Sequence, residues 1–227
     1  MKPIHPPVPA RGTNRFVFRK REGFSLIELL IVLNILVYFF WMVAPMLSSI
    51  LTGQGVSEAA FELSSAVERA RNEAVTRKTY VWLGIQEEVQ EGNLGLRIGT
   101  VCSKDGTANT NAANMMPLGA SVLIAKVGLV GIGSANAVAP TASAVDLLDF
   151  TGGTKFQIGK NSFVQGRTVT FMPLGEAATN SVPTTASGFN PLLMLALRQT
   201  HGTNLFPGND VILAIDGSVG TPVLYRK

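Results

Sequence analysis

The longest apolar stretch of the sequence covers residues 29–51, which are 23 consecutive positions without a charged side chain. As an α-helix rising about 1.5 Å per residue, this stretch would be roughly 35 Å long. The hydrocarbon core of a bilayer is about 30 Å thick, so the pattern predicts a transmembrane helix. A cleaved secretory signal is the weaker interpretation because its apolar region usually has about 7–15 residues.

A second periodicity follows at residues 56–78, where apolar side chains recur at intervals of three and four. This spacing predicts an amphipathic helix with one face against a domain core. Gly53 and Gly55 loosen the chain before it, and Ser57 is a residue type that starts helices, so we expect a second helical stretch to begin there. The predicted core-facing stripe consists of Ala60, Leu63, Val67, Ala70 and Ala74.

Beyond residue 78 the helical period gives way to short runs rich in β-branched residues, separated by Gly, Asn, Pro, Ser and Thr. These runs predict an antiparallel β domain over 79–227. Residues 192–197 are apolar on both faces and are expected as a central strand, and 210–225 as a closing hairpin. The strands are expected at 79–85, 94–101, 120–130, 145–150, 154–158, 167–172, 192–198 and 210–215, and the long loops at 103–117, 131–143 and 175–191.

The composition and charge restrict the class of protein further. Hydrophobic residues make up 46% and charged residues 15%, whereas soluble domains average about 25% charged. The net charge of +4 would suit a nucleic-acid partner, but residues 1–23 hold six basic side chains and one acidic side chain. The remaining chain has 13 basic and 14 acidic residues, so no nucleic-acid partner is expected. Basic residues before the apolar stretch predict a cytoplasmic N-terminus.

The residues available for catalysis or metal binding are few. The chain has one cysteine, Cys102, and two histidines, His5 and His201, and it lacks the sequence motifs of nucleotide, zinc and serine-hydrolase sites. Cys102 is expected as a small buried hydrophobe and His201 as a structural loop residue. We therefore expect no enzyme activity, cofactor or metal. Two pairs of aspartates are weighed as calcium ligands, and neither lies in the dense pattern of oxygen ligands that a calcium loop has. The pairs are Asp146 with Asp149 and Asp210 with Asp216.

Glu28 is a carboxylate at the start of the predicted membrane helix. An acidic side chain costs about 2.5–3.5 kcal/mol at the centre of a bilayer, and less near its surface. One interpretation is a side chain that reaches the lipid headgroups. The other is a positively charged partner: cleavage between Gly23 and Phe24 would create an α-amino group on Phe24 that could pair with Glu28 of a neighbouring subunit.

The residues around Glu28 resemble the leader of type IV pilins and type II secretion pseudopilins. The resemblance rests on the basic run before Gly23, on the aromatic Phe24 and on Glu28 within an apolar helix. In that family a membrane-embedded prepilin peptidase cuts after the glycine and N-methylates the new first residue. The resemblance thus implies cleavage after Gly23, methylation of Phe24, and assembly roles for Glu28 and for Pro45, where many members have a helix-kinking proline. Asn34 and the aromatic residues 38–41 depart from the family pattern.

Residues 20–85, roughly, resemble minor pseudopilins of the GspH and FimT type. A weaker resemblance is to the pilin-like group called Verru_Chthon cassette protein D. The resemblance implies an α+β, pilin-like fold, in which a long N-terminal transmembrane helix precedes an antiparallel β-sandwich-like domain. It implies a single-pass protein of the bacterial inner membrane. Its expected parts are a leader at 1–23, a transmembrane and assembly helix at 24–51, an amphipathic continuation at 52–78 and a periplasmic β-rich domain at 79–227.

The function implied by this resemblance is structural. We expect a minor pseudopilin or pilin-like subunit of a type II secretion or type IV pilus-like filament, with prepilin peptidase, other pilins and inner-membrane lipid as partners. Two alternatives remain open. One is an adhesive or DNA-uptake minor pilin that binds a ligand through its long loops, and the other is a membrane-anchored periplasmic hydrolase.

Overall fold

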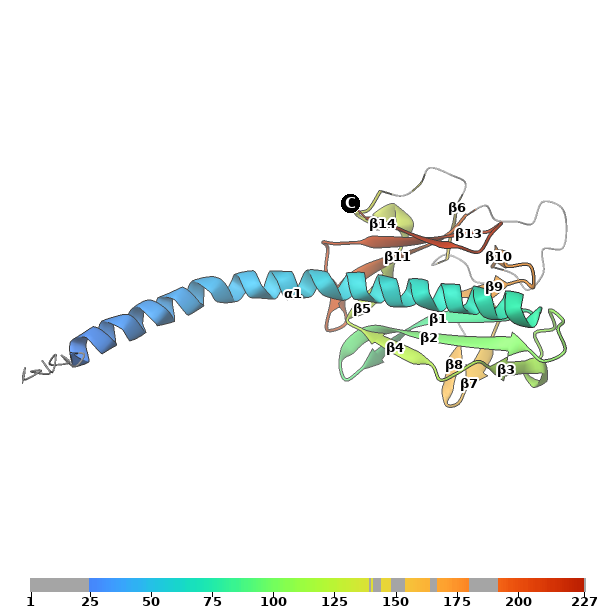
Figure 1. Cartoon of the computed structure of the whole chain (residues 1–227), viewed down its shortest axis with the longest axis horizontal. Helices are drawn as coiled ribbons and strands as arrows, with labels where there is room; N and C mark the ends of the chain where they lie inside the picture. The colour runs from blue at the N-terminus through green and yellow to red at the C-terminus, as the bar shows by residue number, and fades with distance from the viewer. Residues whose placement is uncertain are drawn as a thin grey trace, which may run out of the picture. The chain divides into compact units, whose positions relative to one another are not determined.

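The computed structural model describes residues 25–138, 140, 144–147, 154–163, 167–179 and 192–226, with the side chains of helical residues 43–54 left out. The chain divides into two compact units, Met1–Met46 and Leu47–Lys227. The first described element, α1, is a 52-residue α-helix that spans Leu26–Arg77 and enters both units (Figure 1).

Helix α1 is continuous where the sequence suggested a break. Gly53, Gly55 and Ser57 all lie inside it, so the expectation that a second helical stretch starts at Ser57 is wrong. A glycine inside a helix costs only about 1 kcal/mol relative to alanine. That cost does not end a helix whose neighbouring turns continue on both sides.

No helix among the described residues is both long enough and apolar enough to cross a membrane. This finding contradicts the predicted fold class, which placed a transmembrane helix at 24–51 before a pilin-like β-sandwich, and it does not bear out the single-pass inner-membrane location. The described fold consists of α1, two short 3₁₀ helices and mostly antiparallel sheets.

Helix α1 ends in a Schellman motif. Lys78 follows the last helical residue with a positive φ of 52°. The N–H of Lys78 donates to the carbonyl of Val75, and the N–H of Thr79 donates to the carbonyl of Ala74 at 3.1 Å. These two bonds satisfy carbonyl groups that the helix end would otherwise leave without partners, and they direct the chain into the first strand.

The first sheet has six strands in the order β10–β9–β1–β2–β3, with β4 also paired to β2. All its pairings are antiparallel. The longest ladder joins β1 to β2 as a hairpin that turns at Glu91 and Gly92, both of which have positive φ. The strands are β1 Val81–Gln90, β2 Asn93–Ser103, β3 Met115–Pro117, β4 Val122–Ala125, β9 Thr168–Phe171 and β10 Ala177–Ala178, with the 3₁₀ helix η1 Ala112–Asn114 before β3.

The second sheet also has six strands, in the order β12–β11–β13–β14, with β5 and β6 paired to β11. Strand β11 is central, as the apolar run at 192–197 predicted, and β13 with β14 forms the predicted closing hairpin. Among the described strands of this sheet, only β6 runs parallel to its partner. The strands are β5 Val127–Val130, β6 Ala144–Asp146, β11 Leu192–His201, β12 Asn204–Leu205, β13 Val211–Asp216 and β14 Pro222–Arg226, with η2 Ile132–Ser134 after β5.

The single strand expected at 120–130 is two strands in different sheets. Lys126 separates them with a φ of 63°; β4 before it pairs with β2, and β5 after it pairs with β11. Its N–H donates to the carbonyl of Leu94, and its carbonyl accepts from the N–H of Thr200. Lys126 is therefore the point at which the chain crosses between the sheets.

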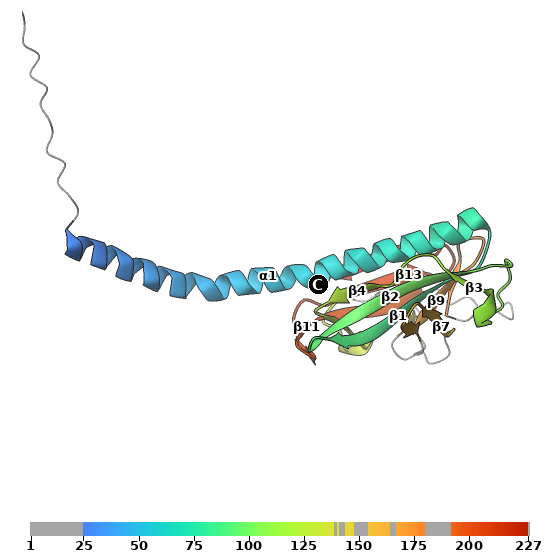
Figure 2. The same ribbon diagram turned by 90° about the horizontal axis from the view of Figure 1, so that it is seen from below.

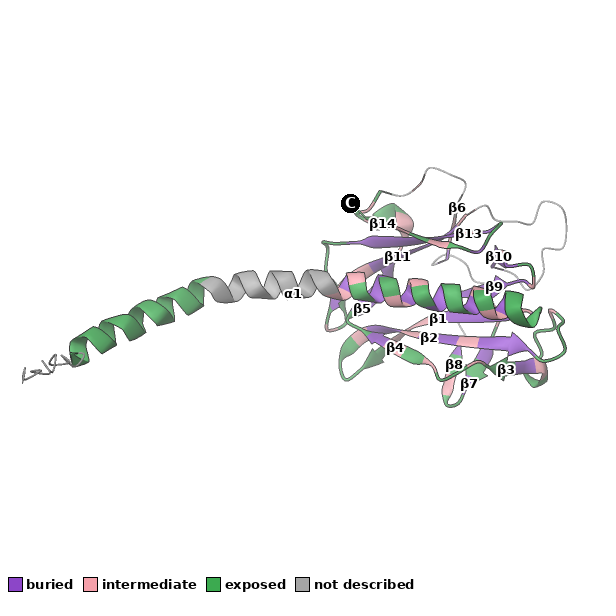
Figure 3. Cartoon of the chain, viewed as in Figure 1, coloured by how far each residue is buried: buried purple, intermediate pink, exposed green. Residues whose placement is uncertain are grey.

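The main core lies between α1 and the inner faces of the two sheets. The predicted stripe of α1 is confirmed, because all five of its residues are fully buried (Figure 3). They pack with Leu83 and Ile85 of the first sheet and with Leu195 and Leu213 of the second. The outer face of β11 is covered separately, since Met194 and Ala196 pack against Ile132 and neighbouring alanines of the loop after β5. This cover explains why β11 is apolar on both faces.

A small hairpin covers the outer face of the first sheet. Strands β7 Phe156–Ile158 and β8 Asn161–Phe163 form it, and their phenylalanine rings stack with centroids 4.8 Å apart. Below the rings, Gly84 and Gly99 are directly opposite each other across β1 and β2. A Cβ on Gly99 would lie 2.5 Å from Phe163 Cζ. The glycine pair is therefore the flat surface that lets the rings contact the sheet.

Substitution of this glycine tests the contact. We predict that Gly99→Ala lowers the free energy of unfolding by about 1–3 kcal/mol, because the added methyl group overpacks the interface with the hairpin. Urea unfolding of the full chain measures the change. Gly119→Ala is the matched control, because a Cβ there meets nothing within 4 Å. Equal stability changes for the two variants would contradict this account.

Candidate functional site

The first part of α1, residues 26–42, exposes apolar side chains in every direction. Each large hydrophobic residue between Leu26 and Met42 is exposed, from 45% for Leu36 to 83% for Trp41. Figure 3 shows this part of the helix as exposed throughout. Soluble monomers rarely expose contiguous apolar patches beyond a few hundred Å², so this surface, which we call the apolar half of α1, is the first candidate for a functional interface.

Glu28 lies in the first turn of α1 and is exposed. The carbonyl of Ser25 accepts the first helical hydrogen bond, from the N–H of Leu29 at 3.1 Å. Ser25 is thus the N-cap residue, and Glu28 follows it with the Ser-x-x-Glu spacing of a capping box. A carboxylate here also interacts favourably with the helix dipole. The Ser-x-x-Glu motif is a signal of the sequence itself, but the predicted roles of Glu28 did not draw on it.

The other residues of the predicted processing and assembly site lie mostly outside the residues and side chains that the structure describes. Gly23 and Phe24 lie outside the described residues, so cleavage and methylation there stay predictions. Pro45 lies within α1, and its side chain is outside the described ones. Asn34, by contrast, is described: it is exposed, and its Nδ2 donates to the carbonyl of Leu30 at 3.0 Å.

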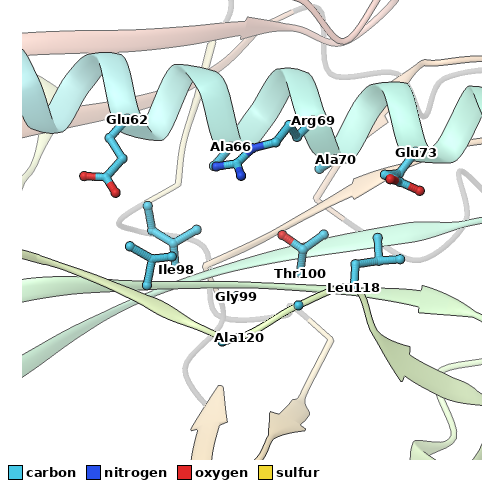
Figure 4. Close-up of a pocket in the computed structure, with 12 residues that line it drawn as sticks. Glu62, Ala66, Arg69, Ala70, Glu73, Ile98, Gly99, Thr100, Leu118 and Ala120 are labelled. Carbon is cyan, nitrogen blue, oxygen red and sulfur yellow. The ribbon is translucent and has the colours of Figure 1, made fainter.

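A hollow of about 140 Å³ lies between α1 and the first sheet (Figure 4). It opens where β3 and β4 leave a gap along β2, since four residues, 118–121, stand opposite Gly99 and Thr100. Glu62, Arg69 and Glu73 line it from α1. Ligand sites for small molecules usually measure about 300–1,000 Å³, so this hollow is small for one. It also contains no histidine or cysteine.

The residues weighed for other chemistry are separated in the structure. Cys102 is buried in the core, where burial raises the pKa of its thiol. His201 is exposed at the end of β11. Asp210 precedes β13 and Asp216 ends it, while Asp146 accepts a hydrogen bond from the N–H of Ile132, and Asp149 lies outside the described residues. Within the described ranges, no cluster of three or more His, Cys, Asp or Glu side chains could hold a metal ion.

The predicted loop at 103–117 is organised around one carboxylate. Asp105 Oδ1 accepts hydrogen bonds from Ser103 Oγ, from the N–H and Oγ1 of Thr107, and from Asn114 Nδ2, at 2.7–2.9 Å. These bonds, those of Thr107 above all, hold the pKa of Asp105 well below its ordinary range. The segment also contains η1 and β3. Its polar residues therefore stabilise the segment itself.

A buried ion pair joins the second sheet to the loop after β5. Arg198 donates to both oxygens of Asp210 at 2.9 and 2.7 Å, and the N–H of Asn136 donates to Oδ2 at 2.6 Å. Burial alone would raise the pKa of Asp210, but the hydrogen bonds from Arg198 and Asn136 outweigh it, so the pKa lies below its ordinary value. The guanidinium of Arg198 also donates to the carbonyl of Ser134. This cluster is structural, because both oxygens of Asp210 and two nitrogens of the Arg198 guanidinium are bonded within the fold.

No protein-family model, curated protein or solved structure matches the chain. The functional argument therefore rests on the apolar half of α1 and on the sequence resemblance around Glu28.

The Asp210–Arg198 pair makes stability depend on pH. An aspartate with a lowered pKa stabilises the fold above about pH 4, and this contribution is lost as the pH falls towards the pKa of the folded state. We predict that Asp210→Asn lowers the free energy of unfolding near pH 7 by about 3 kcal/mol, because it leaves the charge of Arg198 unpaired. The variant should also lose less stability than the wild type between pH 5 and pH 3, which lie on either side of the ordinary aspartate pKa of about 4.

Urea unfolding across this pH range measures both effects. Glu73→Gln is the control: it removes an exposed i,i+4 pair with Arg77, and exposed pairs contribute little. A loss for Asp210→Asn as small as that of the control would refute the structural role of the pair.

Proposed function

We propose that this chain is a structural subunit of a filament, a minor pseudopilin or pilin-like protein whose apolar half of α1 packs against the helices of neighbouring subunits. One observation carries the proposal. Helix α1 is a single element whose C-terminal half packs against the β domain through a stripe rich in alanine, while residues 26–42 expose bulky apolar side chains all round.

The exposure pattern favours a bundle of several helices over a single partner. A helix that is apolar on all faces is covered only when neighbours surround it. Burial of each Leu, Ile or Phe side chain contributes about 1.5–3 kcal/mol, and fifteen large hydrophobic side chains between Leu26 and Met42 are available for burial. Repeated lateral packing of identical or similar helices, as in a filament, would bury them.

Glu28 supplies a reason for ordered packing. A carboxylate enclosed among apolar helices is costly without a positive partner. Cleavage after Gly23 would create that partner, the α-amino group of Phe24 on a neighbouring subunit. Processing by a prepilin peptidase, and a place for the β domain on the periplasmic side of the bacterial envelope, belong to the same proposal. The proposal assigns the chain no catalytic step.

The processing step is tested by the mass of the mature protein. We predict that the chain purified from cells with a prepilin peptidase begins at Phe24 and carries one additional methyl group. Intact-mass and N-terminal peptide analysis measure both features. Gly23→Leu should block cleavage, because the family's peptidase cuts after glycine. A wild-type chain that retains residues 1–23 in such cells would disprove the processing claim.

Two substitutions of Glu28 separate its two candidate roles. A capping box accepts glutamine in place of glutamate, whereas a charge pair with an amino group does not. We predict that Glu28→Gln leaves the protein folded and processed but reduces its incorporation into filaments at least about tenfold, similarly to Glu28→Ala, as loss of a buried charge pair requires. Quantitative blotting of sheared filaments measures incorporation. Normal incorporation of Glu28→Gln would assign the residue to helix capping alone.

A further inference from the structure

Two polar side chains within the apolar half of α1 are not explained by Glu28 pairing. Asn34 and Tyr38 are both exposed, Tyr38 at 76%. Asn34 Nδ2 is bonded to the carbonyl of Leu30, and no described residue supplies a partner for Asn34 Oδ1 or for the Tyr38 hydroxyl. When neighbouring helices cover this surface, unpaired amide and hydroxyl groups become costly. Both residues then need a partner on another helix.

The spacing of these residues matches the spacing of the proposed charge pair. Tyr38 follows Asn34 by four positions, and Glu28 follows residue 24 by four positions. If one helix is shifted by four residues against a parallel copy, so that Glu28 reaches the level of residue 24, then Tyr38 reaches the level of Asn34. The interval between the two pairs is ten residues on each helix, or one heptad plus three. This interval keeps both pairs in one helix–helix seam.

We infer that Tyr38 of one subunit donates a hydrogen bond to Asn34 Oδ1 of the next, and that this bond helps to fix a four-residue shift between parallel copies of α1. The inference rests on the proposed function and names the contact that sets the register of its interface. Each bond joins different residues on the two copies, so the interface is heterologous and repeats from subunit to subunit. Such an interface generates an open filament when the repeat does not close into a ring.

The charges favour a shifted copy over an unshifted one. Without a shift, two parallel copies would place Glu28 opposite Glu28 in an apolar seam, where like charges repel. Pairing within one helix is the remaining alternative, because Asn34 and Tyr38 are i,i+4 neighbours. Among the described residues the bond of the Asn34 side chain is the one from Nδ2 to the carbonyl of Leu30, and the Tyr38 hydroxyl of the same helix does not donate to Asn34 Oδ1. The partner of Tyr38 is therefore assigned to a second copy.

Cysteine cross-linking measures the shift directly. Two differently tagged full-length chains are produced together in filament-forming cells, one with Asn34→Cys and the other with Tyr38→Cys, and are then oxidised. A disulfide requires Cα atoms within about 7 Å. We expect the mixed pair to cross-link at least about five times more than the two unshifted pairs, Asn34→Cys with itself and Tyr38→Cys with itself. The wild-type chain, whose Cys102 is buried, gives the background.

A second measurement tests the hydrogen bond itself. Tyr38→Phe removes only the hydroxyl, and Asn34→Leu replaces the amide by an apolar group of similar size. Each substitution should lower filament incorporation about threefold, as expected for loss of one hydrogen bond between helices in an apolar environment. The double variant should lose no more than either single variant, because both remove the same bond. Additive losses in the double variant would refute the pairing.

The outcomes separate this inference from the proposed function. If the wild-type chain enters filaments and Glu28→Gln does not, but the unshifted cysteine pairs cross-link best, the four-residue shift is refuted and the filament role stands. If the wild-type chain never enters filaments, both are refuted. Preferential cross-linking of the mixed pair together with non-additive losses supports the assigned register.

Discussion

The packing of the C-terminal half of α1 against both sheets is the contact on which the rest of this structure depends. Ala60, Ala70 and Ala74 are small enough to bring the helix close to the strands, and Leu63 and Val67 fill the space between the two inner faces. Arg71 also joins the helix to the second sheet, since its Nε donates to the carbonyl of Val219 in the β13–β14 turn at 2.5 Å. Without the helix, each sheet would expose its inner apolar face. The same element therefore completes the core and provides the backbone that leads to the apolar half.

The two halves of α1 differ in side-chain size, and this difference separates their roles. The C-terminal half of α1 lies along the strands of its own domain (Figure 2) and presents a stripe rich in alanine to them. The apolar half carries leucine, isoleucine and aromatic side chains that no described residue covers. Small residues suit close contact with a sheet that is already in place. Large residues give more buried area to partners that arrive later. A filament subunit needs both properties on one helix.

Local patterns predicted the elements that depend on local order, and missed those that depend on distant partners. The stripe at 60–74 and the closing hairpin were predictable, because a three- and four-residue period and a Gly-Ser pair after an apolar run, here Gly217 and Ser218, are local signals. Lys126 was not, since no glycine, proline or asparagine marks the crossing between sheets. The glycines at 84 and 99 gain their meaning only when paired across two strands, and Asp210 only beside Arg198. At the candidate site, the charge of Glu28 within an apolar run was noted in the sequence, while its Ser-x-x-Glu spacing from Ser25 was overlooked.

The i,i+4 spacing at Glu28 raises a question about what determines the register of an assembly. If the chain starts at residue 24, Glu28 lies one helical turn from the amino group of its own chain as well as from that of a neighbour. Pairing within the chain and pairing between chains then satisfy the same charges, so repulsion between unshifted copies of Glu28 is weaker than for an unpaired carboxylate, and the charge pair favours a shifted neighbour only in part. Asn34 and Tyr38 have the same spacing, but Asn34 is already bonded to Leu30 and the two side chains make no bond within the helix. Two polar groups without a hydrogen-bond partner in their own helix gain a bond when a second copy packs against them. Groups that are already bonded within the helix gain none. The contact between Tyr38 and Asn34 is thus the one that distinguishes a neighbour in register from the helix itself.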